Sequence, residues 1–331
     1  MKKAALHNLG CKVNAYETEA MQQMLEEAGY EIVPFSEKAD VYVINTCSVT
    51  NMGDRKSRQI IRRAKKLNPN AVIAVTGCYA QTAPDEVLAI EGVNLVLGTK
   101  DRKNIVTLVE ELNTESNINH VSDIMSNHEF EELQIKQYSN RTRAFIKIQE
   151  GCNQFCSYCI IPYARGPVRS RAKDDVVREI KELAHNGFKE IILVGIHVAS
   201  YGVDLGDTTL ESLIMDVDKI DGVERIRLSS IEPMTLNQEF IDSIKDSKKL
   251  CHHFHISLQS GCDETLKRMN RKYTTAQFKG IVDGLREAFD DVAITTDIMV
   301  GFPDESDEEF NKTVEFVRNI KNSGNPGRAV V

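Results

Sequence analysis

Residues 150–166 read EGCNQFCSYCIIPYARG and contain three cysteines in the spacing C-x3-C-x2-C: Cys152, Cys156 and Cys159. Three thiolates this close in sequence are able to share one small metal centre. A tetrahedral zinc site or a 4Fe–4S cluster normally has four protein ligands. No fourth ligand lies nearby, since the next histidine downstream is His185. The motif therefore predicts a 4Fe–4S cluster with one open iron, and an incomplete zinc site is the alternative.

The composition is that of an ordinary globular protein. The chain has 331 residues, 41% of them hydrophobic and 27% charged, which is enough for two domains with full cores. No apolar run approaches the ~20 residues of a membrane span, so no membrane partner is expected. The N-terminal stretch MKKAALHNLG lacks the apolar core of a signal peptide. Eight cysteines without such a signal indicate metal or redox ligands in a reducing cytoplasm rather than disulfides.

The net charge of −8 is unevenly distributed. Residues 1–112 contain 14 Lys+Arg and 14 Asp+Glu, so the remainder carries the whole acidic excess. Within the neutral part, residues 55–66 hold cations and no acid. As a helix, this stretch keeps Ile60, Ile61 and Ala64 for the core, and its cations favour binding to a nucleic-acid backbone. A merely solvated helix is the alternative. The candidate RNA-binding residues are Arg55, Lys56, Arg58, Arg62, Arg63, Lys65 and Lys66.

The first third of the chain alternates predicted strands and helices. Strands are expected at 2–9, 40–46, 71–77 and 94–98, and helices at 16–28, 55–66, after Pro84 and at 104–112. Repeated βα units with near-continuous apolar strands indicate an open parallel sheet covered on both faces, in an α/β domain spanning residues 1–112.

Each of the first three predicted strands ends directly in a cysteine: Cys11, Cys47 and Cys78. The carboxyl ends of parallel strands lie at one edge of a sheet, where ligands bind in open α/β folds. The three thiols are therefore expected to converge on a second three-cysteine cluster. A zinc site and a hydrophobic group of thiols are the alternatives.

Residues 113–140 are polar, lack periodicity and are interpreted as a linker. A second βα series follows over residues 141–321. Its strands are expected at 143–151, 190–198, 225–233, 253–261 and 293–303, and its helices at 174–186, 210–220, 238–246, 276–288 and 307–322. This spacing predicts a partial (β/α) barrel with its site at the carboxyl face.

Polar residues follow the strands of this second series and are candidates for cofactor binding. They are Gly195, His197, Ser229, Ser230, Glu232, Gln259, Ser260 and Asp297. Three cations, Arg268, Arg271 and Lys272, are expected either to meet a carboxylate or an RNA phosphate or to form an exposed helix end. The two remaining cysteines, Cys251 and Cys262, lack a ligand-like setting and are expected to be structural.

Four motifs together resemble the methylthiotransferases, a family of radical SAM enzymes. They are N-L-G-C-K-V-N-A-Y-E-T-E (8–19), I-N-T-C-S-V-T (44–50), V-T-G-C-Y-A-Q (75–81) and the cysteine loop, in the family's order. The resemblance covers residues 3–321. Four residues are typical of the branch acting on N6-threonylcarbamoyladenosine in tRNA: Lys12, Val13, Ile196 and His197.

The resemblance implies two 4Fe–4S clusters, with S-adenosylmethionine bound at the open iron of the cluster on Cys152, Cys156 and Cys159. It implies methylthiolation at C2 of the modified adenosine beside the anticodon, without catalytic side chains beyond the cluster ligands. Its implied partners are tRNA and an electron donor such as flavodoxin or ferredoxin. A family member acting on isopentenyladenosine or on a ribosomal protein, and a two-cluster electron-transfer or sensor protein, are the alternatives.

The resemblance also implies a six-strand partial barrel followed by a small RNA-binding TRAM domain. Only five strands are recognisable here, and residues 322–331 resemble an unstructured tail. We therefore expect a truncated chain that lacks the last barrel strand and the TRAM domain.

Overall fold

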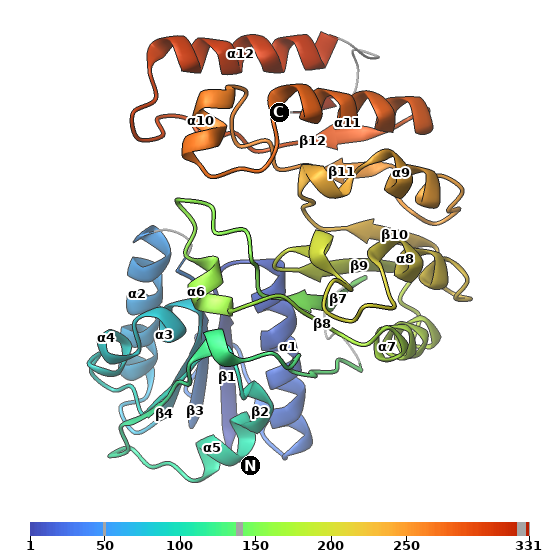
Figure 1. Cartoon of the computed structure of the whole chain (residues 1–331). Helices are drawn as coiled ribbons and strands as arrows, with labels where there is room; N and C mark the ends of the chain where they lie inside the picture. The colour runs from blue at the N-terminus through green and yellow to red at the C-terminus, as the bar shows by residue number, and fades with distance from the viewer. Residues whose placement is uncertain (49–50, 137–141, 323–328, 331) are drawn as a thin grey trace. The chain divides into compact units, whose positions relative to one another are not determined.

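The computed structural model describes residues 1–48, 51–136, 142–322 and 329–330 (Figure 1). The chain divides into two compact units. Unit 1 consists of Met1–Ser139, Glu150–Asn153 and Cys159–Arg169, and unit 2 of Asn140–Gln149, Gln154–Tyr158 and Ser170–Val331. The cysteine loop is thus divided between the units in sequence. Among the described residues, no helix combines the length and apolarity needed to cross a membrane.

Unit 1 contains a six-stranded parallel sheet in the order β2-β1-β3-β4-β5-β6. Its strands are β1 (Lys3–Asn8), β2 (Glu31–Ile32), β3 (Val41–Thr46), β4 (Val72–Gly77), β5 (Leu95–Leu97) and β6 (Ile118–His120). Every residue of β3 and β4 is buried, because these central strands have helices on both faces. The predicted open parallel sheet is confirmed.

Two layers of helices cover this sheet (Figure 1). On one face, Met21 and Leu25 of α1 pack with Val43 of β3, and α5 joins the same core. On the other face, Ile61 and Ala64 of α2 pack with apolar residues of β3 and β4, and with α3 and α4. The helices are α1 (Lys12–Glu27), α2 (Asn51–Leu67), α3 (Cys78–Thr82), α4 (Pro84–Leu88), η1 (Arg102–Asn104) and α5 (Ile105–Glu110).

The segment interpreted as a linker contributes secondary structure to unit 1. Its residues 118–120 form β6, which pairs with β5 in the register Val96↔Asn119, and η2 (Ile124–Ser126) follows. The side-chain amide of Asn94 donates to three carbonyls of the preceding turn, at 3.1–3.3 Å. All three residues of β6 are exposed, so this edge strand has no apolar alternation to detect. Residues 137–140 of the expected linker lie outside the described residues.

The second series of strands forms a curved half-barrel, as expected. A four-stranded sheet has the order β10-β9-β7-β8, and a three-stranded sheet has the order β11-β12-β13. Parallel bridges from Ile226 to Leu250 and from Ile231 to Ile256 connect the two sheets. The strands are β7 (Arg143–Glu150), β8 (Arg169–Ser170), β9 (Glu190–Gly195), β10 (Arg225–Leu228), β11 (His253–His255), β12 (Ala293–Thr295) and β13 (Ala329–Val330).

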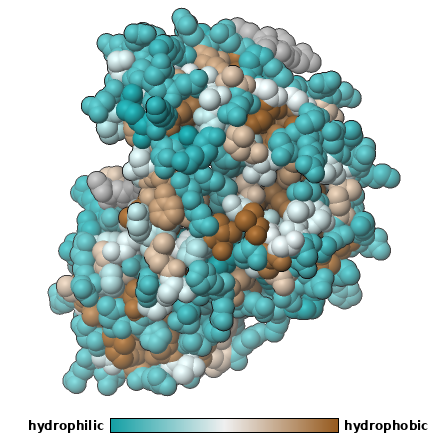
Figure 2. All heavy atoms as spheres, viewed as in Figure 1, coloured by the Kyte–Doolittle hydropathy of each residue, from teal (hydrophilic) through white to brown (hydrophobic). Residues whose placement is uncertain are grey.

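Helices alternate with these strands. Two of them begin with reciprocal capping boxes, Thr209 with Ser212 at α8 and Thr274 with Gln277 at α11. Two short helices, α6 and α10, escape prediction because five or six residues are too few for a periodic pattern. The elements are α6 (Ile161–Arg165), α7 (Lys173–His185), η3 (Val198–Ser200), α8 (Leu210–Asp218), η4 (Pro233–Thr235), α9 (Gln238–Ile244), α10 (Asp263–Arg268), α11 (Thr275–Ala288) and α12 (Asp307–Asn322). The face shown in Figure 2 is mostly hydrophilic in both units.

The expectation of an unstructured tail over residues 322–331 is wrong at three described positions, because Asn322 ends α12 and two others form a strand. Ala329 and Val330 form β13, which pairs in parallel with Ile294 and Thr295 of β12. The fifth barrel strand therefore has a sixth strand on its edge, and two residues are too short a strand to predict from pattern. Residues 323–328 and 331 lie outside the described part of the chain.

Candidate cluster and cofactor sites

The three strand-end cysteines of unit 1 lie at one edge of the sheet. Strands β1, β3 and β4 are neighbours, with Asn8 opposite Asn45 and Thr46 opposite Gly77. Three cysteines follow these strand ends: Cys11 as the N-cap of α1, Cys47 directly after β3 and Cys78 as the first residue of α3. Topology thus brings together residues that lie 36 and 31 positions apart in sequence.

Glycines before two of these cysteines allow the close approach. Gly10 has φ 103° and Gly77 has φ 96°, a region that disfavours other residues. A Cβ atom at Gly10 would lie 2.9 Å from the sulfur of Cys47, and one at Gly77 would lie 2.4 Å from the carbonyl oxygen of Thr46. The Gly-Cys pairs therefore turn the chain at the sheet edge without blocking the neighbouring thiol.

A buried guanidinium lies against this group of cysteines. The Nε–H of Arg165 donates to the sulfur of Cys78 at 3.3 Å, and neither residue is more than marginally exposed. Burial raises the pKa of the Cys78 thiol, and the Arg165 charge opposes this rise. Three thiols beside a fixed positive charge suit an anionic, sulfur-ligated group, so these residues fit an iron–sulfur cluster.

Carboxylates hold Arg165 and a second buried arginine, Arg102, in place. The Nη1 group of Arg165 lies 2.6 Å from Glu17 and 3.0 Å from Glu150. Arg102 lies 2.5 Å from Glu17 and 2.8 Å from Glu131. This network could not be predicted from the sequence, because its members are up to 148 residues apart and follow no local charge pattern.

The centre of the cysteine loop is anchored within unit 2. The Nη1 group of Arg271 donates to the sulfur of Cys156 at 3.3 Å. Phe155 has a φ of 48°, and its carbonyl oxygen accepts a hydrogen bond of 2.9 Å from the amide of Asn270. The backbone N–H of Ser157 donates to Met269 at 3.1 Å. Within unit 1, the N–H of Cys152 donates to the carbonyl of Gly166 at 3.0 Å.

Within the described ranges, no three or more His, Cys, Asp or Glu side chains are grouped tightly enough to hold one metal ion. Neither cysteine set therefore forms a site for a single metal ion within those ranges. A cluster of four irons separates its thiolate ligands more widely than a single zinc ion does.

Two candidate cofactor residues present buried polar atoms without a partner among the described residues. They are Nε2 of His197 and the hydroxyl of Ser229, both at carboxyl ends of barrel strands. Burial, with a contribution from Arg271, lowers the pKa of His197 to about 4. The backbone N–H of His197 donates to Gln149 at 2.7 Å and its Nδ1 lies 2.5 Å from the Ser200 hydroxyl. Atoms left unsatisfied in this way fit a polar ligand such as S-adenosylmethionine.

The other candidates differ in their freedom to meet a ligand. Glu232 is buried 4.0 Å from Arg271, and burial raises its pKa against the effect of that arginine. The hydroxyl of Ser260 is fully buried 3.2 Å from that of Thr313, which indicates a structural role. The remaining candidates are a partly buried Gly195, an exposed Ser230, Gln259 with φ 65°, and Asp297, whose side chain is 79% exposed.

The structure shows the surroundings of the three cations with two possible roles and of the two cysteines outside the cluster motifs. Arg268 forms a two-pronged ion pair with Glu309, and Lys272 donates to Asn270 at 2.6 Å. The thiol of Cys262 donates to Glu264 at 2.9 Å. Burial raises the pKa of Cys251. Only Arg271 among the three cations lies against a cysteine of the loop.

The predicted basic stretch lies on α2, and two of its seven cations are engaged. Arg58 donates to the Tyr79 hydroxyl at 3.0 Å and to Glu86 at 3.1 Å. Lys65 donates to the carbonyl of Pro69 at 2.9 Å. The other five are exposed: Arg55, Lys56, Arg62, Arg63 and Lys66.

Comparison with known proteins matches both parts of the chain. Residues 146–317 match the Radical SAM superfamily, and residues 3–98 match the Uncharacterized protein family UPF0004. The chain is 49% identical to the threonylcarbamoyladenosine tRNA methylthiotransferase MtaB of Bacillus subtilis (strain 168), over 97% of this chain and 72% of the relative. It is 41% identical to MtaB of Aquifex aeolicus (strain VF5), over 96% and 78%.

It is also 38% identical to the tRNA-2-methylthio-N(6)-dimethylallyladenosine synthase of Thermoanaerobacter pseudethanolicus, over 96% of this chain and 68% of the relative. Among solved structures, the radical S-adenosylmethionine methyltransferase TsrM of Kitasatospora setae, with cobalamin and a [4Fe-4S] cluster bound, has a TM-score of 0.69 at 16% identity. That match covers 97% of this chain and 74% of TsrM. At this identity, the likeness to TsrM concerns the fold alone.

The half-barrel, the C-x3-C-x2-C loop and the match over residues 146–317 define a radical SAM enzyme, a class that binds S-adenosylmethionine and an iron–sulfur cluster. The alternative hypothesis, that the chain is a two-cluster electron-transfer or sensor protein without enzymatic activity, is therefore wrong. Within that class, the chain belongs to the methylthiotransferase family.

Proposed function

We propose that the chain methylthiolates N6-threonylcarbamoyladenosine in tRNA. The observation that carries the proposal is the set of three cysteines at the ends of β1, β3 and β4, beside Arg165, in an enzyme that has a separate radical SAM loop. The 49% identity to a relative named for that substrate supports the substrate, as do Lys12, Val13, Ile196 and His197.

Two 4Fe–4S clusters are part of the proposal. Cys152, Cys156 and Cys159 would hold the cluster that binds S-adenosylmethionine, and Arg271 would fix the Cys156 sulfur. Buried polar atoms at the barrel's carboxyl face, at His197 and Ser229, would bind the cofactor's polar groups. When bound, the cluster and S-adenosylmethionine supply the radical chemistry, while the protein orients and shields the reacting groups.

The second cluster would be held by Cys11, Cys47 and Cys78, at the sheet edge of unit 1. Its environment combines a buried thiol, a partly buried thiol, an exposed thiol and a buried guanidinium. The exposed Cys11 leaves this edge open on one side. An edge of that kind suits a cluster that must hand sulfur to a large substrate.

The proposed RNA contact is the exposed face of α2. Its five exposed cations would bind phosphates near the modified nucleoside, which lies in a single-stranded loop whose bases are accessible to a protein. An electron donor of the flavodoxin or ferredoxin type completes the proposed partners.

The test uses the full chain, reconstituted anaerobically with iron and sulfide and supplied with S-adenosylmethionine and dithionite. It is given two tRNA preparations, one bearing N6-threonylcarbamoyladenosine and one bearing isopentenyladenosine. Digestion to nucleosides and mass spectrometry should detect the methylthio group only on the first. Modification of isopentenyladenosine alone would assign the chain to the other branch, and modification of neither would contradict a tRNA substrate.

A further inference from the structure

The cysteines at the sheet edge of unit 1 are contacted by a residue from outside the N-terminal domain that the sequence predicts. Arg165 lies six positions after Cys159, in the segment that matches the Radical SAM superfamily. Within the structure it belongs to unit 1, and its side chain has no exposed surface. Its Nε–H donates to the sulfur of Cys78 at 3.3 Å.

The other donors of this guanidinium fix its direction. Nη1 meets Glu17 at 2.6 Å and Glu150 at 3.0 Å, and Nη2 meets Glu17 at 3.2 Å and the side-chain oxygen of Asn14. The guanidinium is a rigid planar fork, so occupying both Nη groups leaves Nε directed at the sulfur. The contact with Cys78 is therefore held by neighbours on α1 and at the end of β7.

Fold stability alone gives little reason for this arrangement. A buried ion pair contributes little net stability, and well-packed apolar residues often replace it without loss. A hydrogen bond from a cation to a sulfur becomes strong when the sulfur is anionic, as it is in a cluster ligand. Stability therefore does not explain why the charged Nε–H of Arg165 is directed at the thiol of Cys78, and a functional explanation is needed.

We infer that Arg165 is a positioning residue for the N-terminal cluster, and this inference rests on the proposed function. Its Nε–H donates to the cluster-bound sulfur of Cys78, and its positive charge favours the more negative, reduced state of that cluster. Hydrogen bonds to sulfur and local charge are among the properties that set iron–sulfur potentials. The segment that carries the second cysteine motif thus also completes the first cluster site.

The test measures a reduction potential in the full chain. In a Cys152→Ala/Cys156→Ala/Cys159→Ala background, only the N-terminal cluster remains, and dithionite is the reductant. Two charge-neutral double variants are compared in that background by a redox titration followed by electron paramagnetic resonance. Glu17→Gln/Arg165→Gln removes the pair beside Cys78. Arg171→Gln/Glu179→Gln removes an equally buried pair in unit 2.

We expect the first double variant to lower the ratio of reduced to oxidised cluster about tenfold at a fixed ambient potential, a shift of ~59 mV. The second should leave the ratio unchanged. Equal potentials for the two double variants would overturn the role of Arg165. A background protein that binds no iron would overturn both this role and the proposed second cluster, so the two failures are distinguishable.

Loss of Arg165 and Glu17 together could prevent folding, which circular dichroism would detect. In that case Arg165→Lys supplies the result, because lysine keeps the positive charge and lacks the Nε–H. A folded Arg165→Lys protein with a lowered potential supports the inference. An unchanged potential overturns the hydrogen bond from Nε as the cause of the shift and leaves only the positive charge.

Discussion

The Nη1 group of Arg271 lies 3.3 Å from the sulfur of Cys156. The same guanidinium receives support from two neighbours, the hydroxyl of Tyr273 at 3.1 Å from Nε and the carbonyl of Ser257 at 3.3 Å from Nη2. It also stacks on the Tyr273 ring, 4.9 Å from the centroid. Each of the two cysteine sets thus has one largely buried arginine in contact with one of its sulfurs.

Replacing Arg271 with Gln should slow the cleavage of S-adenosylmethionine about 10–100-fold, as expected when a group that orients a metal ligand is lost. The assay is 5′-deoxyadenosine release by the reconstituted enzyme under dithionite. Arg268→Gln is the matched control, because Arg268 lies on the same segment and pairs with Glu309 instead of a cysteine. Equal rates for the two variants would refute a specific role for Arg271.

Removing one carboxylate from the buried network of unit 1 should destabilise the apoprotein strongly. Glu17→Gln removes one carboxylate that both Arg102 and Arg165 contact and leaves Glu131 and Glu150 in place, and breaking a buried pair costs roughly 3–5 kcal/mol. Urea denaturation measures the loss. Glu27→Gln, on the same helix, breaks an exposed pair with Lys136 and should cost less than about 1 kcal/mol. If both variants lost a similar amount of stability, the buried network would not stabilise the fold more than an exposed ion pair does.

The lowered pKa of His197 predicts that the stability of the folded chain depends on pH. Its pKa is about 4 in the folded chain, against 6.5 for an ordinary histidine, so only the unfolded state takes up a proton between these values. Stability should therefore fall as the pH drops from about 6.5 towards 4, by about 1–3 kcal/mol, and this loss should disappear in His197→Gln.

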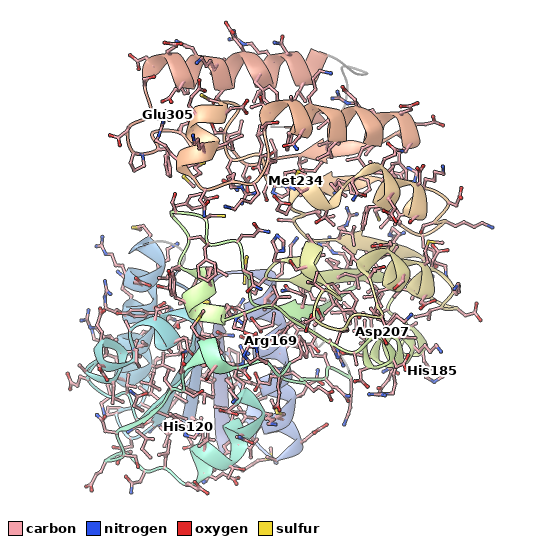
Figure 3. All side chains as sticks on the ribbon, viewed as in Figure 1. His120, Arg169, His185, Asp207, Met234 and Glu305 are labelled. Atoms are coloured by element: carbon pink, nitrogen blue, oxygen red, sulfur yellow. The ribbon has the colours of Figure 1, made fainter. Side chains whose placement is uncertain are left out.

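Urea midpoints of the apoprotein at pH 7 and pH 5 measure the effect. His185→Gln, which changes an exposed histidine at the end of α7 (Figure 3), is the control and should retain the wild-type pH dependence. If His197→Gln and wild type lost the same stability between the two pH values, the assignment to His197 would be wrong.

The exposed cations of α2 should contribute most of the chain's affinity for tRNA. Arg62→Gln/Arg63→Gln/Lys66→Gln should weaken tRNA binding and reduce the slope of log K against log salt by up to about three counterions. Arg58→Gln/Lys65→Gln should change the slope less, because Glu86 and Pro69 already engage these two side chains. If the triple variant bound tRNA with unaltered affinity, α2 would be a solvated surface helix and not an RNA-binding one.

The sequence was sufficient to predict those features that repeat locally. Continuous apolar runs identified β3 and β4, and regular spacing identified α7, α9 and α11 to within a few residues. Cysteines placed directly after strands predicted that Cys11, Cys47 and Cys78 share one sheet edge, because parallel strands end on the same side.

Contacts between distant segments could not be predicted in this way. Arg165 meets Glu17 across 148 positions, and Arg271 meets Cys156 across 115. Unit 1 extends beyond residue 112, the predicted end of the first domain, through contacts of the same kind. Strand β6 and the segment Cys159–Arg169 belong to unit 1 through backbone pairing and buried charges, which leave no periodic trace in the sequence.

The most direct test of the account counts iron after removal of each cysteine set. Full-length Cys152→Ala/Cys156→Ala/Cys159→Ala and Cys11→Ala/Cys47→Ala/Cys78→Ala proteins are reconstituted anaerobically beside the wild type, and their folding is checked by circular dichroism. Two separate 4Fe–4S clusters predict that each variant retains about half of the wild-type iron. A folded first variant that retains no iron, or a second variant that retains all of it, would contradict a cluster on Cys11, Cys47 and Cys78.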